Sequence, residues 1–409
     1  MKISNIKITP VGVPLQSIDT QSRFRAGKRI LVSVIVEVCT DEGITGIGEA
    51  PSVMGGDLTE NILNTVEESL IGKNPLHVNR IMKELYVSYN LAHVHLHAAN
   101  WALNGIEMAL WDIIGKVARL PLYEVWGGPF RLEIPYYGHV ERQEPEAMSK
   151  EAFYLSKAGF KTLYTKVGLN PEEDLTAVEA MRKGANSSGI KNIKIRVDAN
   201  QSWSPGEAVR MINAMAQYDL EFVDQPVLMY NIDALKRVRE SVSVPISAHE
   251  SGWTFYEVLN VIKNQAADVI HIDPRFDAGL YGARISAGIA EAAGIPVVVH
   301  SFGELGVAFT ANMHLAAAIP NCTLANQEDG YRYLTDDVIT GGLLKFKEGK
   351  VHIPDGPGLG VTLDKEKLAY CAEYYQKEIR EKGLDRKLRT GLYGSMYLRQ
   401  YLRDWRNID

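Results

Sequence analysis

The amino-acid sequence predicts an α/β protein in which a closed barrel of parallel βα units follows a smaller α+β domain. From residue 134 onward, apolar runs recur about every 25 to 30 residues, each followed by a segment with helical periodicity. Eight such units favour a closed barrel, and the chain has no glycine-rich phosphate-binding fingerprint that would favour an open sheet. The predicted strands lie near residues 134–140, 162–168, 193–200, 220–226, 244–250, 267–274, 296–302 and 322–327.

The residues before the barrel have a different pattern. Strand-like runs extend to about residue 42, and helical periodicity follows from about 57 to 118. Strands followed by helices are typical of a compact α+β unit. After about residue 345 the sequence is strand-like again and ends in a charged, aromatic segment that we expect to be helical. We therefore predict a first domain over 1–130, completed by 345–409, and a barrel over 131–344.

Composition excludes several classes of protein. The formal net charge is −6 and charged residues are spread along the chain, so neither a nucleic-acid surface nor a membrane surface is expected. Cys39, Cys322 and Cys371 lie far apart, which excludes a cysteine-rich zinc site and suits a reducing compartment. The first residues lack the apolar core of a signal peptide, and no apolar run reaches membrane-spanning length. We expect a soluble, cytoplasmic protein.

Polar side chains recur at the carboxyl ends of the predicted strands. In a parallel barrel these ends converge on one mouth, where chemistry takes place. Ionisable groups are rarely buried unless they are paired or bound to a metal, so their presence on six consecutive strands indicates an active site. The side chains concerned are Tyr164, Lys166, Asp198, Asn200, Asp224, Gln225, His249, Glu250, Asp273, His300 and Glu304.

Three of these side chains form a candidate metal site. Asp198, Asp224 and His249 belong to adjacent strands, so their ligand atoms can meet at one point. Two carboxylates and an imidazole suit a divalent cation such as Mg²⁺ or Mn²⁺, and without a cation the carboxylates would repel each other. The histidine favours manganese or iron, whereas availability favours Mg²⁺. The alternative is three unrelated residues that cap helices.

Candidate acids and bases flank this site on both sides. Tyr164 and Lys166 alternate on one strand and face the same way, and a lysine directed at a dication is shifted toward its neutral, basic form. Asp273 ends the strand before His300, so it can orient that ring and raise its basicity. His271 shares the face of Asp273 one layer deeper, and we interpret it as a core or supporting residue. Two bases across a metal predict removal of a proton next to a carboxylate.

Four motifs carry a resemblance to a known family. They are ALWDIIGK at 109–116, VDAN at 197–200, DQP at 224–226 and PDGPGLGV at 354–361. With these motifs the chain resembles the mandelate racemase subgroup of the enolase superfamily over most of its length. The resemblance implies an N-terminal α+β capping domain on a (β/α)7β TIM-like barrel, with Mg²⁺ held by acids on strands three, four and five. It also implies a catalytic pair formed by Asp273 and His300, and a homo-oligomer.

The sequence departs from the family pattern on three strands. The second strand usually carries Lys-x-Lys and here reads Tyr164-x-Lys166. The usual fourth-strand glutamate is Asp224, and the usually acidic fifth-strand ligand is His249. We expect His249 to be the third metal ligand with Glu250 as its neighbour. The alternative, in which Glu250 binds the metal and His249 turns away, stays open.

The same resemblance suggests substrate-binding residues. The subgroup often has an eighth-strand glutamate that donates to the substrate carboxylate, and Glu328 is the candidate in the matching region. The loop that closes over the distal end of the substrate is polar and basic here, with Arg23 and Arg25, which suits a second carboxylate. A solvated loop is the alternative. Asn200 is a further candidate at the strand ends, and Tyr89 of the capping domain could reach the site as an acid.

These observations predict a Mg²⁺-dependent acid sugar dehydratase. We expect a base to remove the α-proton of a small carboxylate sugar through a metal-stabilised enediolate, followed by loss of water to a 2-keto-3-deoxy product. A diacid sugar such as galactarate is the expected substrate. Lys166, His300, Tyr164 and Tyr89 are the candidate acids and bases. Because both Lys166 and His300 are present, a racemase, an epimerase or a cycloisomerase of another carboxylate is the alternative, and an inactive relative is the third.

Overall fold

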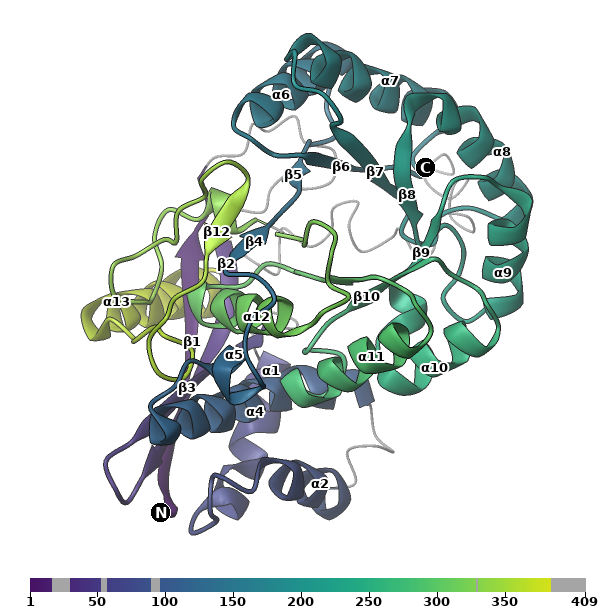
Figure 1. Cartoon of the computed structure of the whole chain (residues 1–409). Coiled ribbons are helices and arrows are strands. Elements are labelled where there is room, and N and C mark those ends of the chain that lie inside the picture. Colours follow the sequence, from purple (N-terminus) through teal and green to yellow (C-terminus); the bar gives the residue numbers. More distant parts are fainter. Residues whose placement is uncertain (17–29, 53–56, 90–95, 329, 384–409) are drawn as a thin grey trace.

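Two main sheets organise the protein. The computed structural model describes residues 1–16, 30–52, 57–89, 96–328 and 330–383. The strands in these ranges are β1 (Ile3–Pro14), β2 (Ile30–Thr40), β3 (Thr45–Pro51), β4 (Glu133–Pro135), β5 (Gly138–His139), β6 (Thr162–Lys166), β7 (Lys194–Asp198), β8 (Leu220–Asp224), β9 (Ile246–Ala248), β10 (Val269–Ile272), β11 (Val297–Val299) and β12 (Lys350–His352). The helices are α1 (Asp57–Val66), α2 (Val78–Ser88), α4 (Leu96–Ala118), α5 (Leu122–Val125), α6 (Pro145–Lys157), α7 (Pro171–Ser187), α8 (Pro205–Met215), α9 (Ile232–Ser241), α10 (Phe255–Lys263), α11 (Leu280–Ala292), α12 (Gly306–Ala318) and α13 (Lys365–Tyr375). β1 to β3 form an antiparallel sheet, and β5 to β11 form a parallel sheet that curls into a barrel with helices along its outer side (Figure 1).

The N-terminal sheet packs closely on the long helix α4. A Cβ atom on Gly46 would lie 2.0 Å from the carbonyl oxygen of Ala109, and one on Gly48 would lie 1.9 Å from that of Gly105. Both distances are far below van der Waals contact, so a larger residue at either position would push the helix off the sheet. Apolar side chains of β1, β2, α1 and α2 fill the rest of this core.

The segment that follows the barrel returns to the N-terminal sheet. Helix α13 packs against β1. Tyr375 and Ile379 form a small apolar cluster with Ile30 and Val32 of β2. Chain segments far apart in sequence therefore share one layer of the molecule, beside the barrel (Figure 1).

The barrel closes through a segment that is not a regular strand. The sequence predicts an eighth strand at 322–327, but the structure has only an isolated bridge there. The backbone N–H of Tyr137 donates to the carbonyl of Asn326 over 3.0 Å, and that of Gln327 donates to the carbonyl of Val299 over 3.1 Å. The Asn326 side chain accepts from the N–H of Val299 over 2.9 Å and takes the place of a backbone acceptor. The predicted fold class is confirmed. Its last strand is irregular because the Asn326 side chain, and not a backbone carbonyl, accepts one of the hydrogen bonds between neighbouring strands.

Two buried carboxylates fasten the N-terminal domain to the barrel. Glu49 in β3 accepts the backbone N–H groups of Leu305 and Ala308, over 2.7 and 2.9 Å, where α12 begins. Glu107 in α4 accepts that of Leu280, over 2.8 Å, where α11 begins. The first N–H groups of a helix have no partner within the helix, so a carboxylate there satisfies them and complements the helix dipole. Burial raises the pKa of both glutamates to about 7.

Two of the sequence motifs meet at Asp112. Its carboxylate accepts the backbone N–H groups of Ile47 and Leu359, each over 2.9 Å, and the ammonium group of Lys116 over 2.6 Å. Gly358 lies against the same carboxylate, because a Cβ atom there would be 2.1 Å from Asp112 Oδ1 and its φ is +72°. The motifs at 109–116 and 354–361 are therefore two sides of one contact.

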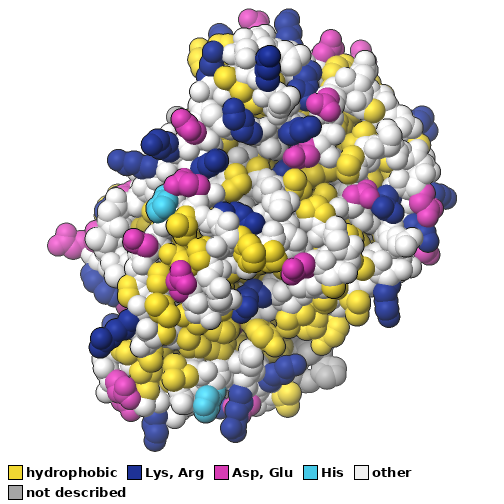
Figure 2. Space-filling view, viewed as in Figure 1, with side chains coloured by type: hydrophobic (Ala, Val, Ile, Leu, Met, Phe, Trp, Pro, Cys, Tyr) yellow, Lys and Arg dark blue, Asp and Glu magenta, His cyan; other side chains and the backbone are white. Residues whose placement is uncertain are grey.

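Charged side chains of both signs are mixed on the surface. Figure 2 shows Lys and Arg interspersed with Asp and Glu over the face in view. This mixture agrees with the small formal net charge of −6. Within the described ranges, every helix is too short or too polar to cross a membrane.

Replacing Asp112 by alanine should destabilise the protein. The change leaves the buried N–H groups of Ile47 and Leu359 without an acceptor, and each such loss costs roughly 1–3 kcal/mol, so the free energy of unfolding should fall by about 2–5 kcal/mol. Urea denaturation followed by circular dichroism measures this. Glu291→Ala removes an exposed carboxylate from α11 and is the matched control. An unchanged midpoint for Asp112→Ala would show that this junction does not stabilise the fold.

Candidate active site

The carboxyl ends of the parallel strands bring the predicted residues together. Lys166 of β6 pairs with Asp198 of β7, which in turn pairs with Asp224 of β8. Ala248 of β9 pairs with Ile270 of β10. The residues that follow them, His249 and His271, therefore lie side by side, with ring centroids 4.8 Å apart. All five side chains are buried. The pairing of the strands therefore builds one continuous row of polar groups inside the mouth of the barrel.

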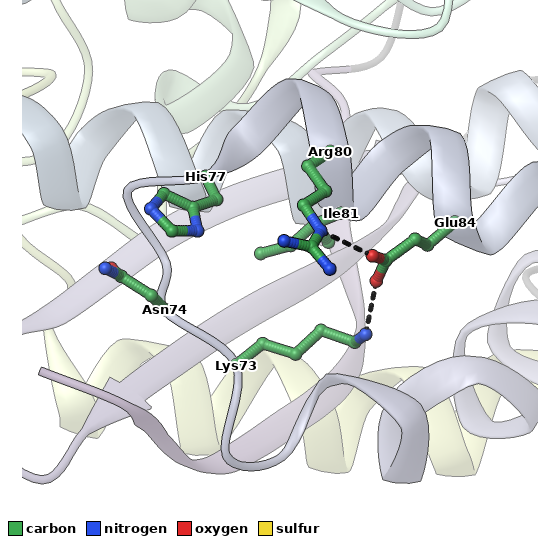
Figure 3. A pocket seen from close by; sticks show the side chains of 6 residues that line it. All are labelled: Lys73, Asn74, His77, Arg80, Ile81 and Glu84. Atoms are coloured by element: carbon green, nitrogen blue, oxygen red, sulfur yellow. Dashed lines mark hydrogen bonds and ion pairs between the residues drawn. The ribbon is translucent and has the colours of Figure 1, made fainter.

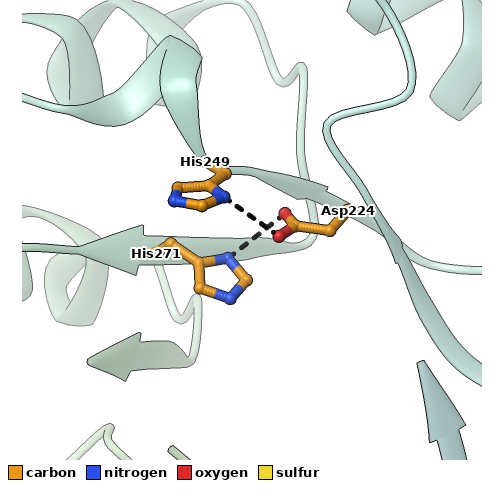
Figure 4. A group of neighbouring side chains, drawn as sticks. All are labelled: Asp224, His249 and His271. Atoms are coloured by element: carbon orange, nitrogen blue, oxygen red, sulfur yellow. Dashed lines mark ion pairs between the residues drawn. The ribbon is translucent and has the colours of Figure 1, made fainter. Parts of the chain in front are cut away.

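Asp224, His249 and His271 form one compact group (Figure 4). The Nδ1 atom of His249 lies 3.2 Å from Asp224 Oδ2, and that of His271 lies 3.3 Å from Asp224 Oδ1. One ligand atom from each residue lies within 4.8 Å of the others. Ser247 Oγ is also 2.8 Å from the Nδ1 atom of His271. The sequence predicts a core or supporting role for His271, and the structure adds a direct contact with the carboxylate that faces His249.

The donor set of this group fits a divalent cation. Within the described part of the chain, neither oxygen of Asp224 and neither ring nitrogen of His249 makes a hydrogen bond of regular geometry, although all four atoms are buried. Burial alone would raise the pKa of Asp224, but His271 and His249 hold it well below its ordinary value. Burial alone would lower the pKa of His249, but Asp224 and Glu250 raise it to about 9. The surroundings thus stabilise positive charge at this point.

Tyr164 and Lys166 both bind Asp198. The Tyr164 hydroxyl and the Lys166 ammonium group each donate to Asp198 Oδ2 over 2.6 Å. The backbone N–H of Asn200 donates to Asp198 Oδ1 over 2.7 Å, and Lys166 also donates to the Oδ1 atom of Asn200 over 2.5 Å. Burial raises the pKa of the Tyr164 hydroxyl well above its ordinary value, so it stays a donor. Asp198 is therefore held by three donors and is not a member of the compact group.

Glu250 lies beside the compact group. Its Oε1 atom accepts from the side-chain amides of Asn200 and Gln201, over 3.0 and 3.1 Å. Its Oε2 atom is 3.7 Å from Nδ1 of His249. His249 and Glu250, the two residues considered for the third ligand position, thus both lie at the candidate cation site. Sequence reasoning missed Gln201, for which the available signal is its place directly after Asn200.

His300 and Asp273 form a hydrogen-bonded pair on the other side of the group. The Nδ1 atom of His300 lies 2.6 Å from Asp273 Oδ2. Arg275 donates to the same carboxylate twice, from Nη2 over 2.7 Å and from Nε over 2.8 Å. Burial alone would raise the pKa of Asp273, but Arg275 and His300 hold it well below its ordinary value. An ionised carboxylate only accepts hydrogen bonds, so Nδ1 of His300 carries the hydrogen and Nε2 keeps a lone pair.

The environment of His300 favours the neutral form of its ring. Burial lowers the pKa of His300 well below its ordinary value, and His249, whose ring centroid is 4.1 Å away, lowers it further. The ring is therefore neutral at physiological pH. Glu304 contacts Arg275 over 3.4 Å and supports the guanidinium from its other side. Sequence reasoning missed Arg275, although an arginine two residues after the strand-end Asp273 is a usable signal.

Two predicted residues, Glu328 and Tyr89, make other contacts, and two more lie outside the described part of the chain. Glu328 is buried and its carboxylate pairs with Arg332, whose backbone N–H also donates to it over 3.3 Å. Tyr89 follows the last residue of α2 and packs against the core of the N-terminal domain. Arg23 and Arg25 lie outside the described residues. Their roles in substrate binding and acid catalysis stay predictions.

An aromatic wall, formed by Trp101, Trp253, Phe276 and Phe302, stands next to His300. Trp101 belongs to α4, and the other three residues lie in the loops after β9, β10 and β11. Trp253 and Phe276 stack with centroids 3.9 Å apart, and Trp101 lies 5.0 Å from Phe276 and 5.5 Å from Phe302. The ring of Phe302 is 6.4 Å from that of His300, and this residue is 41% exposed. The wall is apolar, whereas the sequence predicts polar, basic surroundings for the substrate.

A hollow lies on the N-terminal domain, at the start of α2 (Figure 3). Its volume is about 210 Å³. Lys73 and Arg80 line it, but both pair with Glu84, over 2.5 and 2.7 Å. The hollow is formed by Lys73, Asn74, His77, Arg80, Ile81 and Glu84. Because Glu84 already compensates its cations and no strand-end residue lines it, we assign it no part in the candidate active site.

Comparison with known proteins defines the class of this chain. Residues 6–127 match the family model of the mandelate racemase / muconate lactonizing enzyme N-terminal domain. Residues 147–367 match the enolase C-terminal domain-like family model. The chain therefore belongs to the enolase superfamily, in the mandelate racemase subgroup, as the sequence motifs predict.

Several similar proteins are epimerases or racemases. A hydrophobic dipeptide epimerase of Enterococcus faecalis is 33% identical over 81% of this chain and 91% of its own length. The structure of an N-succinyl Arg/Lys racemase from Bacillus cereus is 28% identical, covers 91% and 98% of the two chains and has a TM-score of 0.82. That of a dipeptide epimerase from Cytophaga hutchinsonii, complexed with Mg and the dipeptide D-Ala-L-Val, is 26% identical, covers 90% and 98%, and also has a TM-score of 0.82. An arabinonate dehydratase of Saccharolobus solfataricus is 26% identical over 81% of this chain and 88% of its own length.

Asp273→Asn should lose stability in a pH-dependent way. A carboxyl whose pKa is lowered by folding stabilises the fold above its unfolded pKa of about 3.9 and loses that contribution as the pH falls. The variant removes the ionised carboxylate that pairs most closely with the buried guanidinium of Arg275 and leaves the longer contact with Glu304, so at neutral pH the free energy of unfolding should drop by about 3–5 kcal/mol. The difference from the wild type should shrink below about pH 4.

Urea denaturation over a series of pH values measures this difference. Asp219→Asn, which changes an exposed aspartate, is the matched control and should show no such trend. If the free energies of unfolding of the wild type and Asp273→Asn differ by the same amount at pH 7 and in acid, Arg275 is not held by an ionised Asp273.

Proposed function

We propose that this chain is a divalent-cation-dependent racemase or epimerase that acts at the carbon next to a carboxylate. The observation that carries the proposal is the placement of Lys166 and His300, at the ends of β6 and β11, on either side of the compact group on β8 to β10. Each is held by its own carboxylate, Asp198 or Asp273. Inversion of a carbon centre needs a base on each face, whereas dehydration needs one base and one acid.

The two bases are held in different ways. Asp273 fixes the Nδ1–H of His300 and leaves Nε2 to accept a proton. Asp198 and Asn200 hold the ammonium group of Lys166. In one direction His300 removes the α-proton and Lys166 delivers a proton to the opposite face. In the other direction the deprotonated lysine takes the proton and the imidazolium returns one.

The residues between the two bases would hold the cation. Asp224, His249 and His271 form the compact group, and Glu250 adds an oxygen beside His249. When bound, a cation neutralises a substrate carboxylate and makes the neighbouring C–H more acidic. Superfamily members bind Mg²⁺, and a similar dipeptide epimerase is complexed with Mg. This agrees with the Mg²⁺ predicted from the sequence.

We propose a dipeptide or an N-acylated amino acid as the substrate class. Dipeptide epimerases and an N-succinyl Arg/Lys racemase are among the similar proteins. The aromatic wall beside His300 offers an apolar contact that suits a hydrophobic side chain better than a hydroxylated sugar chain. The predicted galactarate dehydratase is not specifically supported by these relatives. Dehydration is kept as a second candidate because an arabinonate dehydratase is also similar.

Incubation in D₂O should label the α-carbon of the substrate. We expect the wild type, with Mg²⁺ or Mn²⁺, to exchange the α-proton of both epimers of a hydrophobic dipeptide or N-succinyl amino acid. Lys166→Ala should keep exchange with one epimer only and His300→Asn with the other only, because each variant retains one base. Interconversion should fall by about 10²–10⁴-fold in both. Proton NMR and mass spectrometry measure exchange and interconversion separately.

Lys161→Ala is the matched control for this experiment, because it removes an exposed lysine just before β6. It should keep wild-type exchange with both epimers. Full interconversion in either Lys166→Ala or His300→Asn would refute the two-base proposal.

The second candidate activity yields a different product. A library of mono- and diacid sugars, followed by semicarbazide detection of 2-keto acids, tests it. We expect no 2-keto product from the wild type under conditions that support α-proton exchange on dipeptides. If a 2-keto product appears and is lost in His300→Asn or Lys166→Ala, dehydration is the activity and the epimerase proposal is wrong.

A further inference from the structure

Nitrogen ligands face Asp224 from the two strands that follow it. His249 comes directly after β9 and His271 lies in β10. Figure 4 shows both rings with a nitrogen turned toward the same carboxylate. The family pattern has an acid where this chain has His249. The compact group therefore contains two imidazoles and a single carboxylate.

Of the two neighbouring carboxylates, Asp198 is less available than Asp224, and Glu250 keeps one oxygen available. Asp198 accepts hydrogen bonds at both of its oxygens, and Glu250 accepts two at Oε1. By contrast, the oxygens of Asp224, the ring nitrogens of His249 and the Oε2 atom of Glu250 are buried without a regular hydrogen bond among the described residues. The atoms placed to receive a cation thus include imidazole nitrogens as well as carboxylate oxygens.

We propose that this site selects a first-row transition cation such as Mn²⁺, Co²⁺ or Zn²⁺ over Mg²⁺, with Asp224, His249 and His271 as ligands. Imidazole nitrogen suits transition metals, whereas Mg²⁺ prefers oxygen ligands in octahedral geometry and keeps several waters. Two nitrogens in place of oxygens therefore favour the transition cation. The proposal rests on the proposed function in one respect: both take the compact group as the cation site.

Ser247 competes for one of these ligands. Its Oγ atom lies 2.8 Å from Nδ1 of His271. Coordination through that nitrogen requires the hydroxyl to turn away from the ring, which a serine rotamer change provides. The participation of His271 is therefore tested by its own variant, separately from that of His249.

Metal-free protein, prepared by dialysis against a chelator, tests the selectivity without any substrate. Equilibrium dialysis should give a Kd for Mn²⁺ at least about tenfold lower than that for Mg²⁺. Pulsed electron paramagnetic resonance of the Mn²⁺-loaded protein should show couplings to two imidazole ¹⁴N nuclei. His249→Asp, which restores an oxygen ligand, should remove one coupling and bring the ratio of the two Kd values toward one. His271→Asn should remove the other coupling.

His352→Asn is the matched control. It removes a histidine on β12 whose side chain is 62% exposed, so both couplings and both Kd values should stay as in the wild type. Near-ultraviolet circular dichroism verifies that each variant is folded. If a variant fails to fold, the couplings and the Kd ratio of the wild type still decide the proposal.

Each outcome has a definite meaning. A wild type without nitrogen couplings, or with equal Kd values for Mn²⁺ and Mg²⁺, would overturn the proposal. A single coupling that persists in His271→Asn and is lost in His249→Asp would overturn the part of it that includes His271. A protein that shows both couplings but exchanges no α-proton would contradict the proposed function and leave the metal selectivity standing.

Discussion

Carboxylates buried at helix N-termini decide how the capping domain sits on the barrel. Glu49 and Glu107 each accept N–H groups from the first turn of a barrel helix, α12 or α11. Those groups have no partner in their own helix, and a buried interface offers no bulk water to replace one. Burial raises the pKa of both carboxyls to about 7, because the interface excludes solvent from them. The same docking places Trp101 of α4 against Phe302, so the surface beside His300 depends on these two contacts.

Within the mouth of the barrel, Lys166 and His300 are each hydrogen-bonded to a carboxylate, whereas the Asp224 carboxylate between them accepts no regular hydrogen bond among the described residues. Lys166 is tied to Asp198, and His300 to Asp273, each over 2.6 Å. In a buried site of low effective dielectric such pairs are strongly oriented, because separating the partners is costly. The carboxylate of Asp224 faces the rings of two histidines and accepts no regular hydrogen bond among the described residues. Lys166 and His300 are therefore oriented as candidate acid–base groups, while the compact group between them keeps ligand atoms for a cation.

Two departures from the family pattern compensate each other electrostatically. Tyr164 stands where a second lysine is usual and donates to the same oxygen of Asp198 as Lys166 does, so a positive charge is lost and the hydrogen bond is kept. His249 stands where an acid is usual, so a negative charge is lost beside Asp224. The two departures therefore remove one positive and one negative charge from the mouth when a cation holds the His249 ring in its neutral form.

The sequence by itself determined the fold class and where most of the barrel strands end, because the alternation of apolar runs with helical segments is a local property. Residues such as Lys166 and Asp224 could be predicted for the site because each stands where an apolar run stops. Only the tertiary structure decided the contacts between strands. It placed Arg275 on the carboxylate that pairs with His300, turned His271 toward Asp224, and paired Glu328 with Arg332. These contacts depend on strand register and on the rotamers of residues far apart in the chain, and a local sequence pattern contains neither.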